Sequence, residues 1–373
     1  GQRRVGKSYF LFQIMDFIKN RNPEANIIYV NKELVEFDGI KNYLDLVQYV
    51  DSQLVDDKKH YIFIDEIQDI AEFERALRSW QAENRHDIYV TGSNAFLLSG
   101  ELATYLSGRY IAVRMYTLSY AEFLQFHKLE ETNDAFMLYL RYGGLPYLLN
   151  LNFDDITVFE YLRNIYMSIL FKDVMARHEI RNVALLENLV KLLADCAGSA
   201  VSAKSISDFL KSQRMNISPS IILNYLSHLE QAFFVTKVSR MEIQGRKQLE
   251  VGQKYFFEDL GLRNAMVGYK QTDIGKMLEN LVYLHLCMAG FKVFVGKNNT
   301  KEIDFLAEKE GERLYVQVAY LISDESTKER EFGNLLEIKD NYPKLVVTMD
   351  EGARGNYLGI RHLHIRDFLL GKY

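Results

Sequence analysis

The spacing of apolar and polar residues divides this chain into stretches of different period. Near its start, short runs rich in Ile, Val, Tyr and Phe at 26–31, 60–66 and 87–94 predict buried strands. Apolar residues recur with helical spacing at 9–18 and 40–54. Strands that alternate with helices in this way are typical of an α/β domain with a parallel sheet.

The stretch 120–177 has helical spacing almost throughout. Apolar residues recur every three or four positions at 121–127, 133–142, 146–149 and 156–177. Gly143 and Gly144 interrupt this pattern, and Pro146 restarts it, because proline is favoured in the first turn of a helix. We therefore predict a helical domain at 119–182.

Residues 183–262 change pattern again. Helical spacing at 185–196, 202–212 and from Ser218 onward is followed by strand-like runs at 233–239 and 254–257. Three helices and a hairpin form the layout of a winged helix. The outward face of its third helix would present polar side chains with little charge, at Ser220, Asn224, Ser227, His228 and Gln231. Arg240, Arg246 and Lys247 add a modest basic cluster in the predicted wing, so binding of DNA and docking of a protein both stay open.

The last stretch, 263–373, begins with a helical pattern from Gly275 to Gly290. Strand-like segments follow at 292–295, 302–307, 313–319 and 345–348, with a charged helix predicted at 325–338. The chain is thus predicted to contain four domains, at 1–118, 119–182, 183–262 and 263–373.

The first eight residues, GQRRVGKS, match the phosphate-binding loop pattern G-x-x-x-x-G-K-[ST]. The two glycines let backbone N–H groups turn toward phosphate oxygens, and the following helix directs its N-terminus at the same anion. Lys7 would reach the β- and γ-phosphates of ATP, and the Ser8 hydroxyl would bind Mg²⁺. The predicted nucleotide site is the whole loop: Gly1, Gln2, Arg3, Arg4, Val5, Gly6, Lys7 and Ser8. The strand that should precede the loop is missing, so we expect a trimmed piece of a longer protein.

Two carboxylates end the strand-like run at 60–66, as in a Walker B motif. Asp65 would lie at the carboxyl end of a central strand and hold Mg²⁺, and Glu66 would act as general base toward the attacking water. The run at 87–94 ends in small polar residues, of which Thr91, Ser93 and Asn94 are candidate sensors of the γ-phosphate or, alternatively, helix caps.

A turn at Leu106–Gly108 leads into another predicted strand that ends at Val113. Arg109 within it could contact the γ-phosphate of its own or a neighbouring subunit as an arginine finger, or form a structural ion pair.

Net charge, cysteine content and the length of apolar runs limit what this chain is expected to bind. The net charge of −5 and a pI near 6.0 give no global basic field for nucleic acid, so any such contact must be local. Cys196 and Cys287 lie far apart with no zinc spacing and are expected as buried thiols in a reducing cytoplasm. No apolar run reaches the roughly 18 residues needed to span a membrane.

These motifs, together with LSGRY at 106–110, LSYAEFL at 118–124 and YGGLPYLL at 142–149, resemble a prokaryotic AAA+ ATPase family related to the archaeal-type ATPases. The resemblance covers essentially the whole chain. It implies a P-loop core at 1–118, a helical lid over the nucleotide at 119–182, and a C-terminal domain of uncertain function.

The order of elements in 263–373 looks like the PD-(D/E)xK nuclease fold, and the family resemblance supports this. Such nucleases bind magnesium with carboxylates and use a lysine in catalysis. Glu279 matches the helical acid and Asp304 the central acid, but the third element reads Gln317-Val318-Ala319, with neutral glutamine and no lysine. The predicted domain is therefore catalytically inert and used for contact with DNA or protein, or its acids form a buried structural pair.

The leading hypothesis is an ATPase that hydrolyses slowly, whose nucleotide state repositions a winged helix and a degenerate nuclease-like domain. A magnesium-dependent nuclease gated by ATP and acting on mobile or foreign DNA is the second hypothesis. A binding module that holds nucleotide without turnover is the third. Double-stranded DNA, a protein partner and a homo-oligomer stay open, and no membrane contact is expected.

Overall fold

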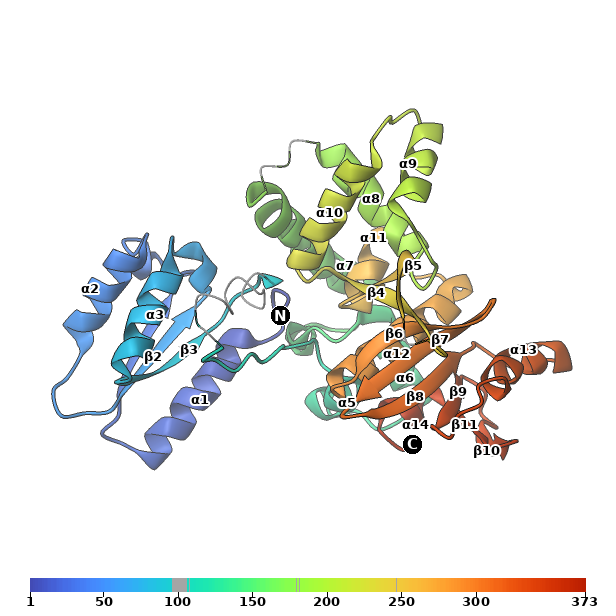
Figure 1. Cartoon of the computed structure of the whole chain (residues 1–373). Helices are drawn as coiled ribbons and strands as arrows, with labels where there is room; N and C mark the ends of the chain where they lie inside the picture. The colour runs from blue at the N-terminus through green and yellow to red at the C-terminus, as the bar shows by residue number, and fades with distance from the viewer. Residues whose placement is uncertain (96–105, 107, 179, 181, 246) are drawn as a thin grey trace. The chain divides into compact units, whose positions relative to one another are not determined.

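The structure is a computed structural model that describes residues 1–95, 106, 108–178, 180, 182–245 and 247–373 (Figure 1). Ser107 of the LSGRY motif and Arg246 of the predicted wing lie outside the described residues. The chain forms two compact units, here called unit 1 (residues 1–115 with 231–233) and unit 2 (116–230 with 234–373).

Unit 1 alternates helices and strands. Its elements are α1 Lys7–Arg21, β1 Asn26–Asn31, η1 Val35–Phe37, α2 Tyr43–Gln53, β2 His60–Asp65, η2 Ile67–Asp69, α3 Phe73–Glu83 and β3 His86–Val90. The three strands form a parallel sheet in the order β1-β2-β3 within the described residues. This confirms the predicted parallel α/β architecture.

Alternation along β2 explains why both faces of this sheet are covered. Ile62 and Ile64 pack on one side into a core shared with α2 and α3. Phe63 points to the opposite side and packs with Leu11 and Ile18 of α1. Successive strand residues face opposite ways, so one strand contributes to two cores, and Figure 1 shows α1 on one side of the sheet and α2 and α3 on the other.

The predicted strand that ends at Val113 was wrong. Residues 109–115 are outside the sheet, and the side chains of Ile111 and Val113 are 92% and 66% exposed. An apolar run becomes a strand only where a neighbouring strand satisfies its backbone and a core covers one face.

Unit 2 begins with a helical region. Its helices up to the hairpin are α5 Tyr120–His127, α6 Asn133–Tyr142, η4 Pro146–Asn150, α7 Asp155–Ser168, its π-helical continuation η5 Ile169–Ala176, α8 Val183–Asp195, α9 Ala203–Ser212 and α10 Pro219–Gln231. The helices predicted from spacing are all present in this region.

The second half of unit 2 contains a large mixed sheet. Its elements are β4 Val235–Glu242, β5 Gln248–Phe257, α11 Leu260–Val267, η6 Gln271–Asp273, α12 Ile274–Met288, β6 Lys292–Asn298, β7 Lys301–Lys309, β8 Glu312–Val318, α13 Glu325–Leu336, β9 Lys344–Thr348, β10 Arg354–Tyr357, β11 Ile360–His364 and α14 Ile365–Leu369. The described strands follow the order β10-β11-β9-β8-β7-β6-β4-β5.

The hairpin predicted as a wing belongs to this sheet. β4 pairs antiparallel with β5 and also parallel with β6, with Arg240 opposite Val295. The predicted boundary at 262 therefore cuts through a continuous hydrogen-bonded sheet, because backbone groups of β4 that a free wing would expose are satisfied by β6.

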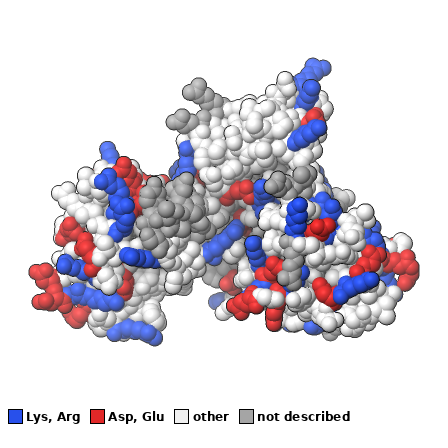
Figure 2. All heavy atoms as spheres, in the orientation of Figure 1, with Lys and Arg blue, Asp and Glu red and all other residues white. Residues whose placement is uncertain are grey.

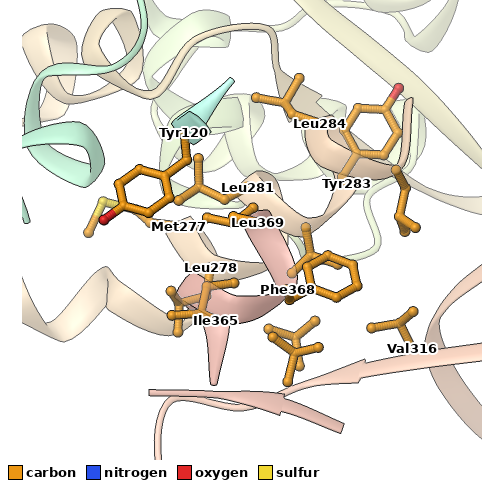
Figure 3. Packing of buried hydrophobic residues seen from close by; sticks show 14 of the residues in the cluster. Tyr120, Met277, Leu278, Leu281, Tyr283, Leu284, Val316, Ile365, Phe368 and Leu369 are labelled. Carbon is orange, nitrogen blue, oxygen red and sulfur yellow. The ribbon is translucent and has the colours of Figure 1, made fainter. Parts of the chain in front are cut away.

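The predicted lid helices share a core with this sheet. Tyr120 of α5 packs with Leu278 and Leu281 of α12 and with Phe368 of α14 in one buried cluster (Figure 3). On the opposite face of the sheet, Phe332 of α13 belongs to a second cluster. The predicted lid at 119–182 is thus part of unit 2 rather than a separate body.

The YGGLP segment owes its two glycines to close packing. A Cβ on Gly143 would lie 2.3 Å from Asp259 Oδ1, and one on Gly144 would lie 2.4 Å from the carbonyl oxygen of Leu118. The Asp259 carboxylate accepts the N–H groups of Gly144 (2.9 Å) and Leu262 (3.0 Å). Burial raises the pKa of Asp259 to about 6 despite these hydrogen bonds.

The structure also shows the burial of the two cysteines and the length of the apolar helices. Cys196 and Cys287 are half-buried rather than fully buried. Across the described part of the chain, no helix is both long enough and apolar enough to cross a membrane.

Candidate functional site

The first candidate site is the loop of residues 1–8 in unit 1. Gly6 adopts φ 97°, a left-handed conformation that favours glycine, and α1 starts directly after it at Lys7. The N-terminus of α1 therefore opens at the loop, where free helical N–H groups favour an anion. Arg4 also has a positive φ of 66°, and Arg3 Nη1 lies 3.5 Å from Glu33 Oε1.

Lys7 is held inside this loop. Its side chain is only 8% exposed, and Nζ donates to the carbonyl oxygens of Gln2 (2.9 Å) and Gly1 (3.3 Å). The same Nζ lies 3.4 Å from Glu66 Oε1. Gln2 is 2% exposed, and neither polar atom of its side chain has a hydrogen-bond partner among the described residues. Polar groups buried in this way need a ligand or water to satisfy them.

Asp65 ends β2 beside the loop, as the sequence predicted. The Thr91 hydroxyl donates to Asp65 Oδ1, and the Tyr29 hydroxyl donates to Oδ2 at 3.3 Å. Burial and the Asp65 charge together raise the pKa of Tyr29 to about 12, so Tyr29 keeps its proton and remains a donor.

Glu66 is the most constrained group of the site. Its φ of 56° is unusual for a residue with a side chain and directs the carboxylate from the end of β2 toward Lys7. Glu66 Oε2 accepts from Gln68 Nε2 and from the Ser93 hydroxyl (3.0 Å). Burial alone would raise the pKa of Glu66, but Lys7 and these two hydrogen bonds outweigh burial and lower it.

The structure brings most of the predicted nucleotide residues together. Thr91 and Ser93 each bond one of the two adjacent carboxylates, and Asn94 is buried close by in the same segment. Ser8 lies in the first turn of α1 and is half-buried. Arg109 is exposed, and its described contacts involve its backbone, which accepts from Gln81 Nε2 at 2.6 Å.

Sequence reasoning missed Tyr29 and Gln68. Tyr29 lies in the strand paired with β2, two residues before the end of β1, and could have been found from the expected register of neighbouring strands. Gln68 follows the Walker B acids by two residues, and only the tight turn after Glu66 brings it back to them.

This donor set fits Mg²⁺ and ATP. A helix N-terminus and a buried lysine that reaches only carbonyl oxygens and one carboxylate suit phosphate. The Asp65 carboxylate and the Ser8 hydroxyl are oxygen ligands of the kind that Mg²⁺ prefers. These residues can bind a nucleoside triphosphate, and Glu66 can serve as an ionised base.

A second polar cluster lies in unit 2. Lys254 of β5 is 3% exposed, and its Nζ lies 3.0 Å from Glu302 Oε1, 3.3 Å from Glu279 Oε2 and 3.5 Å from Asp304 Oδ1. Asp304 Oδ2 accepts the N–H of Val318 at 2.9 Å. The two acids predicted from sequence, Glu279 and Asp304, therefore meet, but around a lysine that the sequence did not indicate.

Burial, more than repulsion between the acids, sets the pKa values in this second cluster. Burial, and then the Asp304 charge, raises the pKa of Glu279, although Lys254 opposes this. Burial likewise raises the pKa of Asp304 against the opposing effect of Lys254. Over the described residues, no group of three or more His, Cys, Asp or Glu side chains is arranged to hold a metal ion.

Gln317, the third predicted member, is also present. Its Oε1 accepts the backbone N–H of Asp304 at 3.3 Å, and its side chain is buried. Ala319 follows β8 directly, so the position where a nuclease of this type carries lysine has no functional group.

The third helix of the predicted winged helix, α10, presents little charge. Ser220, Asn224 and Ser227 are exposed as predicted, but Ile221 and Leu223 are exposed as well. Figure 2 shows few charged side chains over α8–α10 on the face drawn, and elsewhere on that face basic and acidic side chains are interspersed.

Comparison with known proteins shows which family this chain belongs to. Residues 1–124 match the AAA domain, and residues 133–273 match a domain of unknown function, DUF8612. The chain is 37% identical to an uncharacterized protein of Haemophilus influenzae over 376 residues, which cover 99% of this chain and 93% of that protein. It is 30% identical to an uncharacterized protein of Methanocaldococcus jannaschii, over 94% of this chain and 82% of that one.

The fold is also similar to a solved structure, a Walker-type ATPase of Pyrococcus abyssi. The TM-score is 0.51 at 16% identity, over 71% of this chain and 89% of that chain. The AAA domain match and this fold agree with the geometry of the phosphate-binding loop and its two carboxylates. The chain therefore belongs to the same family as these bacterial and archaeal relatives, a family of AAA-type nucleotide-binding ATPases.

Proposed function

We propose that this protein is a slow ATP-driven switch, in which Mg²⁺-ATP bound at residues 1–8 controls what unit 2 contacts. The observation that carries the proposal is the state of Glu66. Its carboxylate contacts Lys7, Gln68 and Ser93 at the same time. The oxygens that would accept the proton of the attacking water are therefore already occupied.

Each residue has a distinct task in this proposal. The loop N–H groups and Lys7 bind the β- and γ-phosphates, and Ser8 and Asp65 would hold Mg²⁺, which supplies charge neutralisation for the transferred phosphoryl group. Thr91 and Tyr29 orient the Asp65 carboxylate by donating to its two oxygens. Glu66 accepts the proton of the attacking water.

Slow turnover follows from the competition for Glu66. The γ-phosphate would draw Lys7 away, but Gln68 and Ser93 would still occupy Glu66 Oε2. Hydrogen bonds to a charged carboxylate are each worth about 1.5–3 kcal/mol, and a water must replace or share them before the base is aligned. Arg109, exposed beside this core, is available to act on the γ-phosphate of its own or a neighbouring subunit.

The output of the switch is proposed to be unit 2. Its α8–α10 helices, whose predicted wing is built into the sheet, and its nuclease-like mixed sheet would contact double-stranded DNA or a protein. Exposed Phe209, Ile221 and Leu223 on α9 and α10 support a protein partner more than a DNA backbone, which requires positive charge.

The test is ATP hydrolysis by the full chain, with and without double-stranded DNA. We expect Lys7→Ala to lose nucleotide binding, and Glu66→Gln to keep binding while hydrolysis falls by about 10²–10⁴-fold, the usual contribution of a general base. Lys19→Ala, a surface lysine of α1, is the matched control and should behave as the unmodified protein. Fast turnover without any partner, or turnover unchanged in Glu66→Gln, would contradict the proposal.

A further inference from the structure

The phosphate-binding loop of unit 1 carries two neighbouring arginines in different surroundings. Arg4 is exposed to solvent. The side chain of Arg3 is only 18% exposed, and its Nη1 donates to Glu33 Oε1 at 3.5 Å. Holding a long side chain in one place costs conformational entropy, so a fixed guanidinium beside a phosphate site needs an explanation.

Glu33, the partner of Arg3, lies at the edge of the sheet where the nucleotide site is found. β1 ends at Asn31, which is paired in register with Asp65 at the end of β2. Asn31 Oδ1 accepts the N–H of Glu33 at 2.9 Å, so the turn after β1 is fixed beside the acid proposed to hold Mg²⁺. The carboxyl ends of parallel strands meet at one edge, which brings this turn to an arginine 30 residues earlier in the chain.

A chain of hydrogen bonds connects the same turn to Asp65. Asn31 Nδ2 donates to the Tyr29 hydroxyl at 3.0 Å, and Tyr29 donates to Asp65 Oδ2 at 3.3 Å. The Asn31 side chain is therefore held at both ends, by Tyr29 through its nitrogen and by Glu33 through its oxygen. As a result, the ion pair between Arg3 and Glu33 is linked to the carboxylate that would bind the cation.

The charge of Arg3 also acts on Glu66, the proposed general base. Burial raises the pKa of Glu66, whereas Lys7, two hydrogen bonds and then the charge of Arg3 lower it. Lys7 Nζ lies 3.4 Å from Glu66 Oε1. In phosphoryl transfer the γ-phosphate is bound by this lysine and faces the water at the base. The positive charge of Arg3 therefore acts on the place where the γ-phosphate would be bound.

We propose that Arg3 binds the γ-phosphate of ATP and that Glu33 holds its guanidinium in the nucleotide-free protein. The exchange of partners favours ATP, because Glu33 is 55% exposed and water screens its charge. ADP has no γ-phosphate, so with ADP bound Arg3 stays with Glu33. Unlike Arg109, Arg3 belongs to the loop itself and needs no second subunit. This inference rests on the nucleotide site proposed above and assigns its preference for ATP over ADP to one arginine.

Nucleotide affinity tests the role of Arg3 without any hydrolysis. The full chain is titrated calorimetrically, in Mg²⁺, with ADP and with adenylyl imidodiphosphate, an ATP analogue that is not hydrolysed. Arg3→Ala should weaken binding of the ATP analogue by about 10–100-fold, the usual value of a hydrogen bond to a charged group, and leave ADP affinity unchanged. Arg75→Ala is the matched control, because it removes an arginine from an exposed ion pair with Glu72, and should bind both nucleotides as the unmodified chain does.

Failure of this inference and failure of the nucleotide site give different results. If the unmodified chain binds neither nucleotide, the proposed site and the role of Arg3 are both wrong. If the unmodified chain binds both nucleotides and Arg3→Ala weakens both equally, the site stands, but Arg3 does not distinguish ATP from ADP and the inference is wrong. Thermal unfolding without nucleotide shows whether Arg3→Ala is folded.

Glu33→Gln tests the competing partner and leaves the loop itself unchanged. Removal of the acid releases Arg3, so affinity for the ATP analogue should rise by about 2–5-fold, the value of an exposed ion pair. The gain should disappear in an Arg3→Ala background, because no arginine remains to be released. Glu72→Gln, which breaks the exposed pair with Arg75, is the matched control and should change neither affinity. Absence of a gain in Glu33→Gln, or a gain that persists in the Arg3→Ala background, would overturn the exchange of partners.

Discussion

The two units each bury a lysine against glutamate, yet they set the pKa of that glutamate in opposite directions. In unit 1, Lys7 Nζ lies 3.4 Å from Glu66 Oε1, and the pKa of Glu66 is lowered. In unit 2, Lys254 Nζ lies 3.3 Å from Glu279 Oε2, and the pKa of Glu279 is raised. The distances are almost equal, so the lysine alone does not decide the outcome.

Burial raises the pKa of both carboxylates, and the difference in direction comes from their other neighbours. Glu66 receives two neutral donors, Gln68 and Ser93, in addition to Lys7. Glu279 shares its lysine with Asp304 and Glu302, and both of these charges repel it. Donors stabilise an ionised carboxylate, whereas nearby acids and burial destabilise it. One arrangement prepares an ionised base, and the other prepares a group that can hold a proton.

The largest expected effect comes from removing the shared lysine of unit 2. Lys254→Met leaves the buried carboxylates without their cation, which should cost about 3 kcal/mol of unfolding free energy at pH 8. Because folded carboxylates with raised pKa values favour the folded state at low pH and lose that stability as pH rises through the folded pKa, the deficit should shrink toward pH 5. Denaturant unfolding of unit 2 across this pH range measures it.

Lys309→Met is the matched control for this prediction. Lys309 is an exposed lysine of β7 that donates to the carbonyl oxygen of Ala289 at 2.8 Å, and its loss should change stability by less than about 0.5 kcal/mol. A Lys254→Met deficit that grows toward pH 5 would show that the carboxylates are not what the lysine stabilises.

A somewhat smaller effect should come from Gly261→Ala, which tests whether the two units are energetically separate. A Cβ on Gly261 would lie 1.9 Å from the carbonyl oxygen of Tyr142, so the backbone must move. We expect a loss of about 2–3 kcal/mol in unit 2 and no change in ATP affinity. Calorimetry with and without Mg²⁺-ATP identifies the unit 1 transition, because a ligand stabilises the unit that binds it.

Gly275→Ala provides the contrast to Gly261→Ala. Gly275 lies in the first turn of α12, where an added Cβ meets nothing within 4 Å. Alanine there should stabilise unit 2 by roughly 0.5–1 kcal/mol. Loss of ATP affinity in Gly261→Ala would instead show that packing in unit 2 reaches the nucleotide site.

A third prediction concerns the donors to Glu66. Ser93→Ala removes a hydrogen bond to the ionised carboxylate, worth about 1.5 kcal/mol, so the pKa of Glu66 should rise by about one unit. The acidic limb of the pH profile for ATP hydrolysis should shift upward by the same amount. Ser79→Ala, which removes a hydroxyl bonded to exposed Glu83 at 3.4 Å, should leave the profile in place. An identical shift in both variants would exclude a specific role for Ser93.

The smallest effect should come from the helix cap of α2 in unit 1. Asn42 Oδ1 accepts the N–H groups of Leu44 (2.8 Å) and Asp45 (3.3 Å), and Asp45 in return accepts the N–H of Asn42. Asn42→Ala should lower the stability of unit 1 by about 1 kcal/mol. The unit 1 transition in calorimetry should move to lower temperature, while the unit 2 transition stays where it is.

Much of unit 1 could be predicted because its signals are local. The loop pattern at 1–8 and the acids at 65 and 66 depend on residues adjacent in sequence, and β2 carries its acids to the expected end of a parallel strand. The predicted strand ending at Val113 failed for the opposite reason. Its apolar residues fit a strand locally, but residues 109–115 pair with no described strand of the sheet, and Ile111 and Val113 stay exposed. Whether a strand finds a partner depends on residues far away in the sequence.

The sequence by itself determined the period of each element, the phosphate-binding loop, and the presence of two acids at positions 279 and 304. Only the tertiary structure decided that the hairpin at 235–257 joins the large sheet and that its Lys254 reaches those acids. A hairpin is recognised by its own turn and alternation, but its neighbours in a sheet depend on which distant edge offers free backbone groups. Here β6 pairs with the backbone of β4, and the Asn280 side chain accepts the backbone N–H of Phe257 at the end of β5. As a result, Lys254 Nζ lies 3.5 Å from Asp304 Oδ1, although the two residues are far apart in the sequence.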